Sequence, residues 1–246
     1  MTAPPPVLWV IRPDDRIEAT AKAFSGLGVD LKYAPVLSYV PTGLALPLSQ
    51  HYDGLVVTSL RALEHIQPIP DHLKACPLFI VGSESARRAR ILGFARVIEA
   101  PTITALIAEI EREVKTESHL LYLRGDVVSQ DLGGVFAARH PDCRIVIDEH
   151  LAYRTAPAPS LDKDITEAIG SGEISHIAFF SAAGAAHFAA LIEQSGLSER
   201  MGSITALCLS PRVLEYARSL PWAQTYTAET PDMTGMVALY RTLLRP

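Results

Sequence analysis

Hydroxyl-bearing and arginine side chains recur where an apolar run of the sequence gives way to a helical pattern. At such points the carboxyl end of a strand meets the amino end of a helix, which is where open α/β sheets bind ligands. The free N–H groups and the dipole of a helix attract anions, and an Arg side chain can bind a carboxylate through two hydrogen bonds. We therefore expect a site for a ligand that carries several carboxylates. Its candidate residues are Arg12, Thr58, Ser59, Arg61, Gly82, Ser83, Ser85, Arg124, Ser181 and Arg212.

Each of these residue types also has an ordinary structural role at a turn. A Ser or Thr there is a common N-cap, because the first N–H groups of every helix lack an intrahelical partner. An Arg at the same place can be a solvated surface residue. For any single turn the capping role is favoured, whereas four such turns facing one cleft favour a site for a polyanion.

Several classes of protein are disfavoured by what the sequence lacks. It has no P-loop, no GxGxxG fingerprint, no HExxH run and no GxSxG elbow. Cys76, Cys143 and Cys208 are scattered without a metal-ligand spacing, and we expect reduced thiols. A net charge of −5 argues against a general nucleic-acid binder. We therefore expect a small-molecule ligand, and no metal, cofactor or nucleic acid.

Apolar runs of four to six residues alternate with helical patterns along the chain. The strands of parallel sheets are buried on both faces and read as continuous apolar runs. The alternation predicts an α/β fold with two doubly wound parallel sheets of flavodoxin-like type. Helical spacing predicts one helix after Arg12 and others over 62–66, 86–92, 103–114, 183–192, 213–220 and 233–244.

The sequence presents one pattern of strands twice. Residues 7–42 and 120–157 each run from an apolar strand through an Arg to a second strand, which ends in Tyr39 or Tyr153. Two further pairs match 53–59 with 175–181 and 78–83 with 206–211. The offset grows from 124 − 12 = 112 to 210 − 82 = 128 residues, as loop insertions would produce. Such self-similarity indicates two related domains, and a cleft between them is a natural ligand site.

The bulk composition agrees with two domains. The chain has 246 residues, of which 48% are hydrophobic and 20% are charged, as in globular proteins. Segments 35–47 and 153–159 are rich in Pro and small residues and are predicted to connect the domains. An aromatic residue that ends a strand there, such as Tyr39, is more often a packing residue than a catalytic acid. With two connections, one domain can interrupt the other.

Six short motifs along the chain occur in the order found in a known enzyme family. They lie at residues 55–62, 79–82 with 85–86, 121–126, 153–155, 179–181 and 228–231 with Gly235. In this order the chain resembles uroporphyrinogen-III synthase, the tetrapyrrole enzyme that closes hydroxymethylbilane with inversion of its last ring. The resemblance covers nearly the whole chain. Its specificity lies in the ordered set, because each motif is short.

The resemblance implies a fold, an activity and a catalytic residue. The fold would consist of two flavodoxin-like domains joined by a two-stranded hinge, with 1–36 and 156–246 forming one domain and 37–155 inserted as the other. The activity would be that of a monomeric, cytoplasmic lyase without cofactor or metal, acting in heme, chlorophyll or cobalamin biosynthesis. Tyr153 matches the cleft-facing Tyr of the family and is the expected donor of a proton to the departing water. The eight carboxylates of the bilane would bind at the helix amino ends.

Two positions depart from the family pattern and keep other functions open. Residues 210–213 read Ser-Pro-Arg-Val in place of Gly-Pro-Thr-Thr, and 127–129 read Val-Val-Ser in place of a small, basic stretch. Both departures support an alternative, a catalytically weak two-lobed tetrapyrrole-binding or regulatory protein on the same scaffold. A third hypothesis is a solute-binding receptor with hinge closure. It is disfavoured because residues 1–6 lack the basic and apolar regions of a signal peptide.

Overall fold

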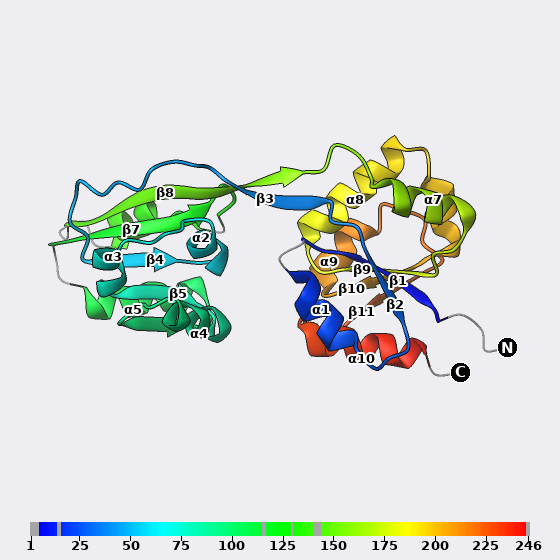
Figure 1. The fold of residues 1–246 in the computed structure, drawn as a ribbon, viewed down its shortest axis with the longest axis horizontal. Helices are drawn as coiled ribbons and strands as arrows, with labels where there is room; N and C mark the ends of the chain where they lie inside the picture. Colours follow the sequence, from blue (N-terminus) through cyan, green and yellow to red (C-terminus); the bar gives the residue numbers. More distant parts are fainter. Residues whose placement is uncertain (1–4, 14–15, 115–116, 129, 140–143, 245–246) are drawn as a thin grey trace. The chain divides into compact units, whose positions relative to one another are not determined.

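The computed structural model describes residues 5–13, 16–114, 117–128, 130–139 and 144–244. The chain forms two compact units, Met1–Ser38 with Ala156–Pro246 (unit 1) and Tyr39–Thr155 (unit 2). The units divide at 38/39 and 155/156, where the family resemblance implies 36/37 and 155/156. Each unit is built on its own, mainly parallel sheet with helices packed against it (Figure 1). The prediction of an α/β fold with parallel sheets is confirmed.

Unit 1 contains a five-stranded sheet in the order β11-β10-β9-β1-β2, with every neighbouring pair parallel. The strands are β1 (Val7–Ile11), β2 (Asp30–Tyr33), β9 (His176–Phe179), β10 (Thr205–Cys208) and β11 (Gln224–Thr227). The helices are α1 (Ile17–Phe24), α7 (Lys163–Ser171), α8 (Ala182–Gln194), α9 (Pro211–Ala217) and α10 (Met233–Leu243), with a 3₁₀ turn at Ser198–Ser203. Helices α7, α8 and α9 contribute to one apolar cluster, and α1 and α10 contribute to a second.

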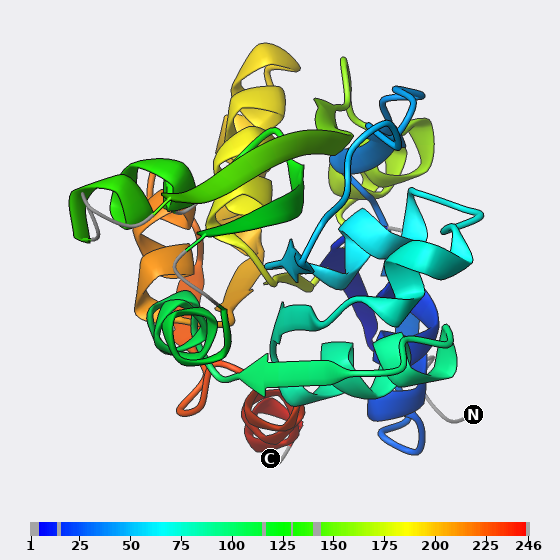
Figure 2. The ribbon, with the colours of Figure 1, turned by 90° about the vertical axis from the view of Figure 1, so that its left-hand side faces the viewer.

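Unit 2 contains a six-stranded sheet in the order β3-β8-β7-β4-β5-β6. The strands are β3 (Leu37–Pro41), β4 (Gly54–Val57), β5 (Leu78–Val81), β6 (Val97–Ala100), β7 (Glu117–Gly125) and β8 (Arg144–Pro157). The helices are α2 (Leu60–Glu64), α3 (Asp71–Ala75), α4 (Ser83–Ile91), α5 (Ile103–Glu113) and α6 (Leu132–Arg139). In Figure 2, α2, α3 and α4 lie on one face of this sheet and α5 and α6 on the other, as the two apolar clusters also require.

Strands β3 and β8 carry the chain from one unit to the other. Thr42 N donates to Ala152 O at 3.0 Å, and Ala158 N donates to Val36 O at 2.9 Å. Ser38 Oγ donates to Ala156 O at 3.3 Å. The paired residues run in opposite directions, so β3 is antiparallel to β8. The two segments that the sequence predicts as connections therefore contain paired strands.

The two sheets have the same strand order but exchange the copies of the sequence repeat. Read from β2 in unit 1 and from β8 in unit 2, the orders are β2-β1-β9-β10-β11 and β8-β7-β4-β5-β6. In unit 1 this is the flavodoxin-like order, in which the second strand lies at the edge beside the first. Unit 2 shows the same order when each strand is numbered within its own copy of the repeat, with β3 added beside β8. Leaving aside β3, which joins the unit 2 sheet beside β8, the first copy of the repeat places two strands in unit 1 and three in unit 2, and the second copy does the reverse. A unit is therefore built from parts of both copies.

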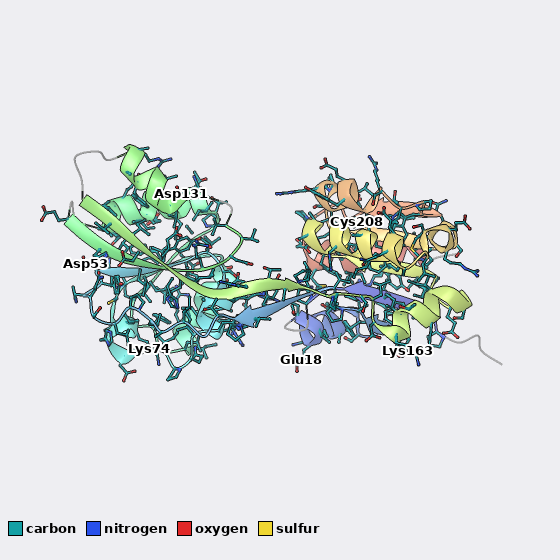
Figure 3. All side chains as sticks on the ribbon, turned by 90° about the horizontal axis from the view of Figure 1, so that it is seen from above. Glu18, Asp53, Lys74, Asp131, Lys163 and Cys208 are labelled. Atoms are coloured by element: carbon teal, nitrogen blue, oxygen red, sulfur yellow. The ribbon has the colours of Figure 1, made fainter. Side chains whose placement is uncertain are left out.

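Two cysteines lie within the described residues, Cys76 and Cys208, and both are free thiols. Cys208, labelled in Figure 3, is fully buried on β10, and burial raises its thiol pKa to about 12. Burial also raises the pKa of the half-buried Cys76 thiol. Both thiols therefore stay protonated and unreactive near neutral pH. Cys143 lies outside the described residues.

Candidate active site

The predicted site residues fall at the carboxyl ends of strands in each unit. Strands β4, β5 and β7 of unit 2 lead into Thr58, Gly82 and Arg124–Gly125, and strands β1, β9 and β10 of unit 1 lead into Arg12, Ser181 and Ser210. This is the edge of a parallel sheet where ligands bind. In unit 2 the structure brings together Thr58, Ser59, Arg61, Gly82, Ser83, Ser85, Arg124 and Tyr153. In unit 1 it brings together Arg12, Ser181 and Arg212.

Tyr153 lies in a tight aromatic setting near the end of β8. Its side chain is 7% exposed. The ring of Tyr39 meets it edge-on at 5.4 Å between centroids, and the ring of His65 lies 5.4 Å away at 43°. Within the described parts of the chain no hydrogen bond holds the Tyr153 hydroxyl, and the oxygen is not among the fully buried polar atoms. The hydroxyl is therefore available to a ligand.

Tyr122 and Thr58 share a hydrogen bond of 3.0 Å across β7 and β4. Burial is the main cause that raises the pKa of Tyr122, and the bond to Thr58 and the charge of Arg124 act against it. Tyr122 is 2% exposed, so its hydroxyl is a structural partner inside the sheet. We expected the Thr58 hydroxyl to contact the ligand. In the structure its partner is the Tyr122 hydroxyl.

The turn hydroxyls of the two units have different uses. Ser181 Oγ accepts from Gly184 N at 3.1 Å and caps α8, and Ser210 Oγ accepts from Val213 N at 3.4 Å and caps α9. In unit 2, Ser59 precedes α2 without a side-chain cap bond, and α4 begins after Gly82 without one. Among the described residues, the side chains of Ser59, Ser83 and Ser85 have no hydrogen-bond partner. The capping alternative thus describes Ser181 and Ser210 in unit 1, whereas Ser59, Ser83 and Ser85 in unit 2 keep free hydroxyls, although Thr102 caps α5 in the same unit.

Three of the four predicted arginines make contacts within the protein. Arg12 donates to Thr20 Oγ1 at 3.1 Å and lies 4.6 Å over the ring of Phe180. The Arg61 guanidinium lies 3.9 Å over the ring of Tyr39, the same ring that packs against Tyr153.

Arg124 is bound within its own sheet. It donates to Glu149 Oε2 at 2.7 Å and to Gly125 O at 2.8 Å. Both partners of this ion pair are partly buried, with side chains 23% and 35% exposed. Arg212, in contrast, lies exposed in the first turn of α9.

The two departures from the family pattern have clear places in the structure. In the first departure, Ser210 caps α9 and Arg212 lies exposed in its first turn. Pro211, which the family pattern shares, occupies the same turn, where a missing N–H costs no hydrogen bond. Val127 and Val128 are 78% and 38% exposed after β7, and Ser129 lies outside the described residues. Asp126, just before them, accepts from both N and Oγ1 of Thr155, at 3.0 and 3.1 Å to Oδ1. This carboxylate thus joins the ends of β7 and β8.

Sequence reasoning missed two residues beside Tyr153, namely Gly125 and His65. His65 follows α2 and also lines a pocket of about 350 Å³ in unit 2. His150 lines the same pocket and is 6% exposed, and burial lowers its pKa. Neither His65 nor His150 belongs to a sequence motif. Their closeness to Tyr153 and to the pocket depends on strand pairing, which the sequence does not show. Gly125 belongs to a motif, but its role depends on the register of β8.

The described residues offer no group of His, Cys, Asp and Glu side chains that could hold a metal ion. They also contain no helix both long and apolar enough to cross a membrane.

A family model described as uroporphyrinogen-III synthase HemD matches residues 18–238, which is most of the chain. The chain belongs to the uroporphyrinogen-III synthase family. The resemblance expected from the six motifs is confirmed. No curated protein sequence matches the chain significantly.

Solved structures of uroporphyrinogen-III synthases share the fold. The enzyme from Helicobacter pylori has a TM-score of 0.63 at 16% identity, covering 97% of this chain and 99% of its own. A mutant enzyme from Thermus thermophilus has a TM-score of 0.55 at 16% identity, covering 98% and 99%. The uroporphyrinogen-III synthase fold therefore extends over the whole chain.

Proposed function

We propose that this uroporphyrinogen-III synthase closes hydroxymethylbilane to uroporphyrinogen III, with Tyr153 as the proton donor. The family match over residues 18–238 carries the activity, that of a cyclising lyase in tetrapyrrole synthesis. The unpartnered hydroxyl of a nearly buried Tyr153 supports the residue assignment. Neither finding favours a binding or regulatory protein without turnover.

The reaction needs no covalent bond between the protein and the substrate. The pyrroles of the substrate help to expel the hydroxymethyl oxygen as water, and the substituted carbon of ring D then attacks the resulting azafulvene. One proton must reach the departing oxygen. In this proposal Tyr153 O–H donates it, with the ring fixed between Tyr39 and His65. A phenol is a weak acid, so it suits a leaving group that the substrate already activates.

The larger task is to hold the bilane so that closure with inversion outcompetes simple closure. In this proposal the hydroxyls of Ser59, Ser83 and Ser85 bind carboxylates of the substrate. Their support is that no described residue already occupies them. Gly82, with φ of 89°, allows the chain to turn sharply into α4. The exposed cation Arg212 offers a further contact in unit 1.

Arg12, Arg61 and Arg124 have a second role in this proposal. Each is anchored by the contacts described above, so each adds fixed positive charge at a carboxyl edge. We also propose that the protein acts as a monomer in the cytoplasm.

An isomer assay tests the proposed activity. Purified protein is supplied with hydroxymethylbilane, and the uroporphyrinogen isomers are oxidised and resolved. We expect the type III isomer to predominate. Type I alone, the spontaneous product, would refute the activity. Tight tetrapyrrole binding together with type I product would favour the regulatory alternative.

A further inference from the structure

The direction of the Tyr153 side chain depends on an irregularity in strand pairing. On β7 and β8, Leu123 pairs with His150 and Arg124 with Leu151, but Gly125 pairs with Tyr153. The extra residue on β8 forms a β-bulge, which re-aims the side chains that follow it. With regular alternation, Tyr153 would face the same way as Leu151. The bulge instead turns it to the face of the sheet that β7 presents at Leu121 and Leu123.

On that face the residue opposite Tyr153 has no side chain. A Cβ built on Gly125 would lie 2.6 Å from Cζ, 2.7 Å from Cε2 and 2.8 Å from the hydroxyl oxygen of Tyr153. Real Cβ atoms do not approach other heavy atoms so closely, so the phenol ring occupies the space that a side chain would need. The part of the ring that covers Gly125 is its hydroxyl end.

The backbone of Gly125 gives no separate reason for a glycine. Gly125 is not among the glycines with positive φ. An alanine could adopt its conformation without the strain of the left-handed region. The obstacle to a larger residue is therefore the Tyr153 ring itself.

We infer that Gly125 is a positioning residue for Tyr153. The inference rests on the proposed role of Tyr153 as proton donor. The bulge directs the ring toward β7, and the missing Cβ lets the hydroxyl end lie flat against the strand. Tyr39 and His65 close two other sides, and the Asp126 carboxylate joins the strand ends just beyond.

Gly125→Ala tests this inference. The added methyl group must displace the hydroxyl end of Tyr153, while carboxylate contacts elsewhere are untouched. We expect kcat to fall about tenfold with KM changed less than about twofold, because small misplacements of a catalytic group are costly. Gly54→Ala is the matched control. A Cβ at Gly54 would also be crowded, 3.0 Å from Phe79 Cε2, but this site lies away from Tyr153. It should leave kcat of the folded enzyme unchanged.

A double-mutant comparison separates positioning from general damage. In a Tyr153→Phe background, which keeps the ring but has no hydroxyl to misplace, Gly125→Ala should change kcat less than about twofold. Equal losses in both backgrounds, or no loss in the native background, would overturn the inference. If Tyr153→Phe alone has full activity, the proposed proton donor is wrong.

Thermal unfolding tests separately whether the Tyr153 ring is what requires a glycine at position 125. This test applies even if Tyr153 is not the proton donor or if Gly125→Ala folds poorly. Gly125→Ala should lower the unfolding temperature by several degrees when Tyr153 is present. In a Tyr153→Ala background the space is open, and the same substitution should lower it far less. Equal shifts in both backgrounds would show that the ring is not what requires a glycine.

Discussion

At the scale of single residues, the phenol of Tyr153 combines near-complete burial with a hydroxyl that has no hydrogen-bond partner among the described residues. Buried tyrosines usually find a hydrogen-bond partner for their hydroxyl, as Tyr122 does with Thr58 and Tyr52 does with Asp148 at 3.0 Å. The free hydroxyl of Tyr153 therefore supports its proposed contact with the substrate.

Tyr153→Phe isolates the proton-donating role. We expect kcat to fall about 10-fold to 100-fold, the low end of general-acid effects, because the substrate assists departure of water. Initial rates of type III formation give the measurement. Tyr216→Phe, on a tyrosine 44% exposed on α9, serves as the control and should act as the native enzyme does. An unchanged rate for Tyr153→Phe would mean that the ring only packs.

At the scale of single elements, similar turns divide their hydroxyls between two tasks. Ser181 and Ser210 satisfy N–H groups of α8 and α9, so their bonds contribute to helix stability. Ser83 opens α4 without such a bond. The difference cannot be read from the turn motifs, because each contains a Ser between a strand and a helix.

Serine-to-alanine substitutions should separate these tasks. Ser210→Ala removes a cap and should lower the free energy of unfolding by about 1 kcal/mol. Ser83→Ala should leave stability within about 0.5 kcal/mol, as for a surface position, and should raise KM. Denaturant unfolding and steady-state kinetics on the same preparations provide the comparison. A loss of stability in Ser83→Ala as large as that in Ser210→Ala would argue against a free hydroxyl.

The predicted elements show where local pattern suffices. Helices predicted over 103–114 and 233–244 are observed as α5 and α10 within one residue, because both have a strongly apolar face and an N-cap. The helix after Arg12 ends before Gly26, which has φ of 80°. Helices α3, α6 and α7 went unpredicted. Helix α3 has only five residues, and α6 contains two adjacent glycines. The helical spacing of apolar residues is therefore weak in both. Helix α7 could have been found from the Asp162 cap and its apolar spacing.

At the scale of the whole molecule, each unit holds a histidine that is removed from solvent, since His150 is buried and His176 is partly buried. Burial lowers the pKa of His150 in unit 2 and of His176 in unit 1. The imidazole of His176 lies edge-on to Tyr240 at 5.6 Å, and its Nδ1 lies 2.8 Å from Ser175 Oγ. Both units therefore hold a histidine that favours the neutral form.

Acidification should weaken both units. Unfolded histidine has a pKa of about 6.5, and the folded values lie below it. Between these pKa values the unfolded chain binds more protons, so stability rises with pH and is complete above about 6.5. We expect the unfolding temperature to fall as the pH decreases from 7.5 to 5.5. His150→Asn should reduce this slope, whereas His51→Asn, at a side chain 88% exposed, should not. An equal slope in both variants would contradict the assignment.

The sequence by itself determined most of the strands, but not β2, β6 or β11, and it indicated the turns and the family, because apolar runs and short motifs are local. It also showed that one pattern occurs twice. Only the tertiary structure decided that each unit, apart from β3, takes two strands from one copy and three from the other, since pairing joins residues distant in the chain. The same holds at the candidate site. Tyr153 faces Gly125 because a bulge shifts the pairing register of β7 and β8. Register depends on both strands together, so the sequence of either strand alone does not reveal it.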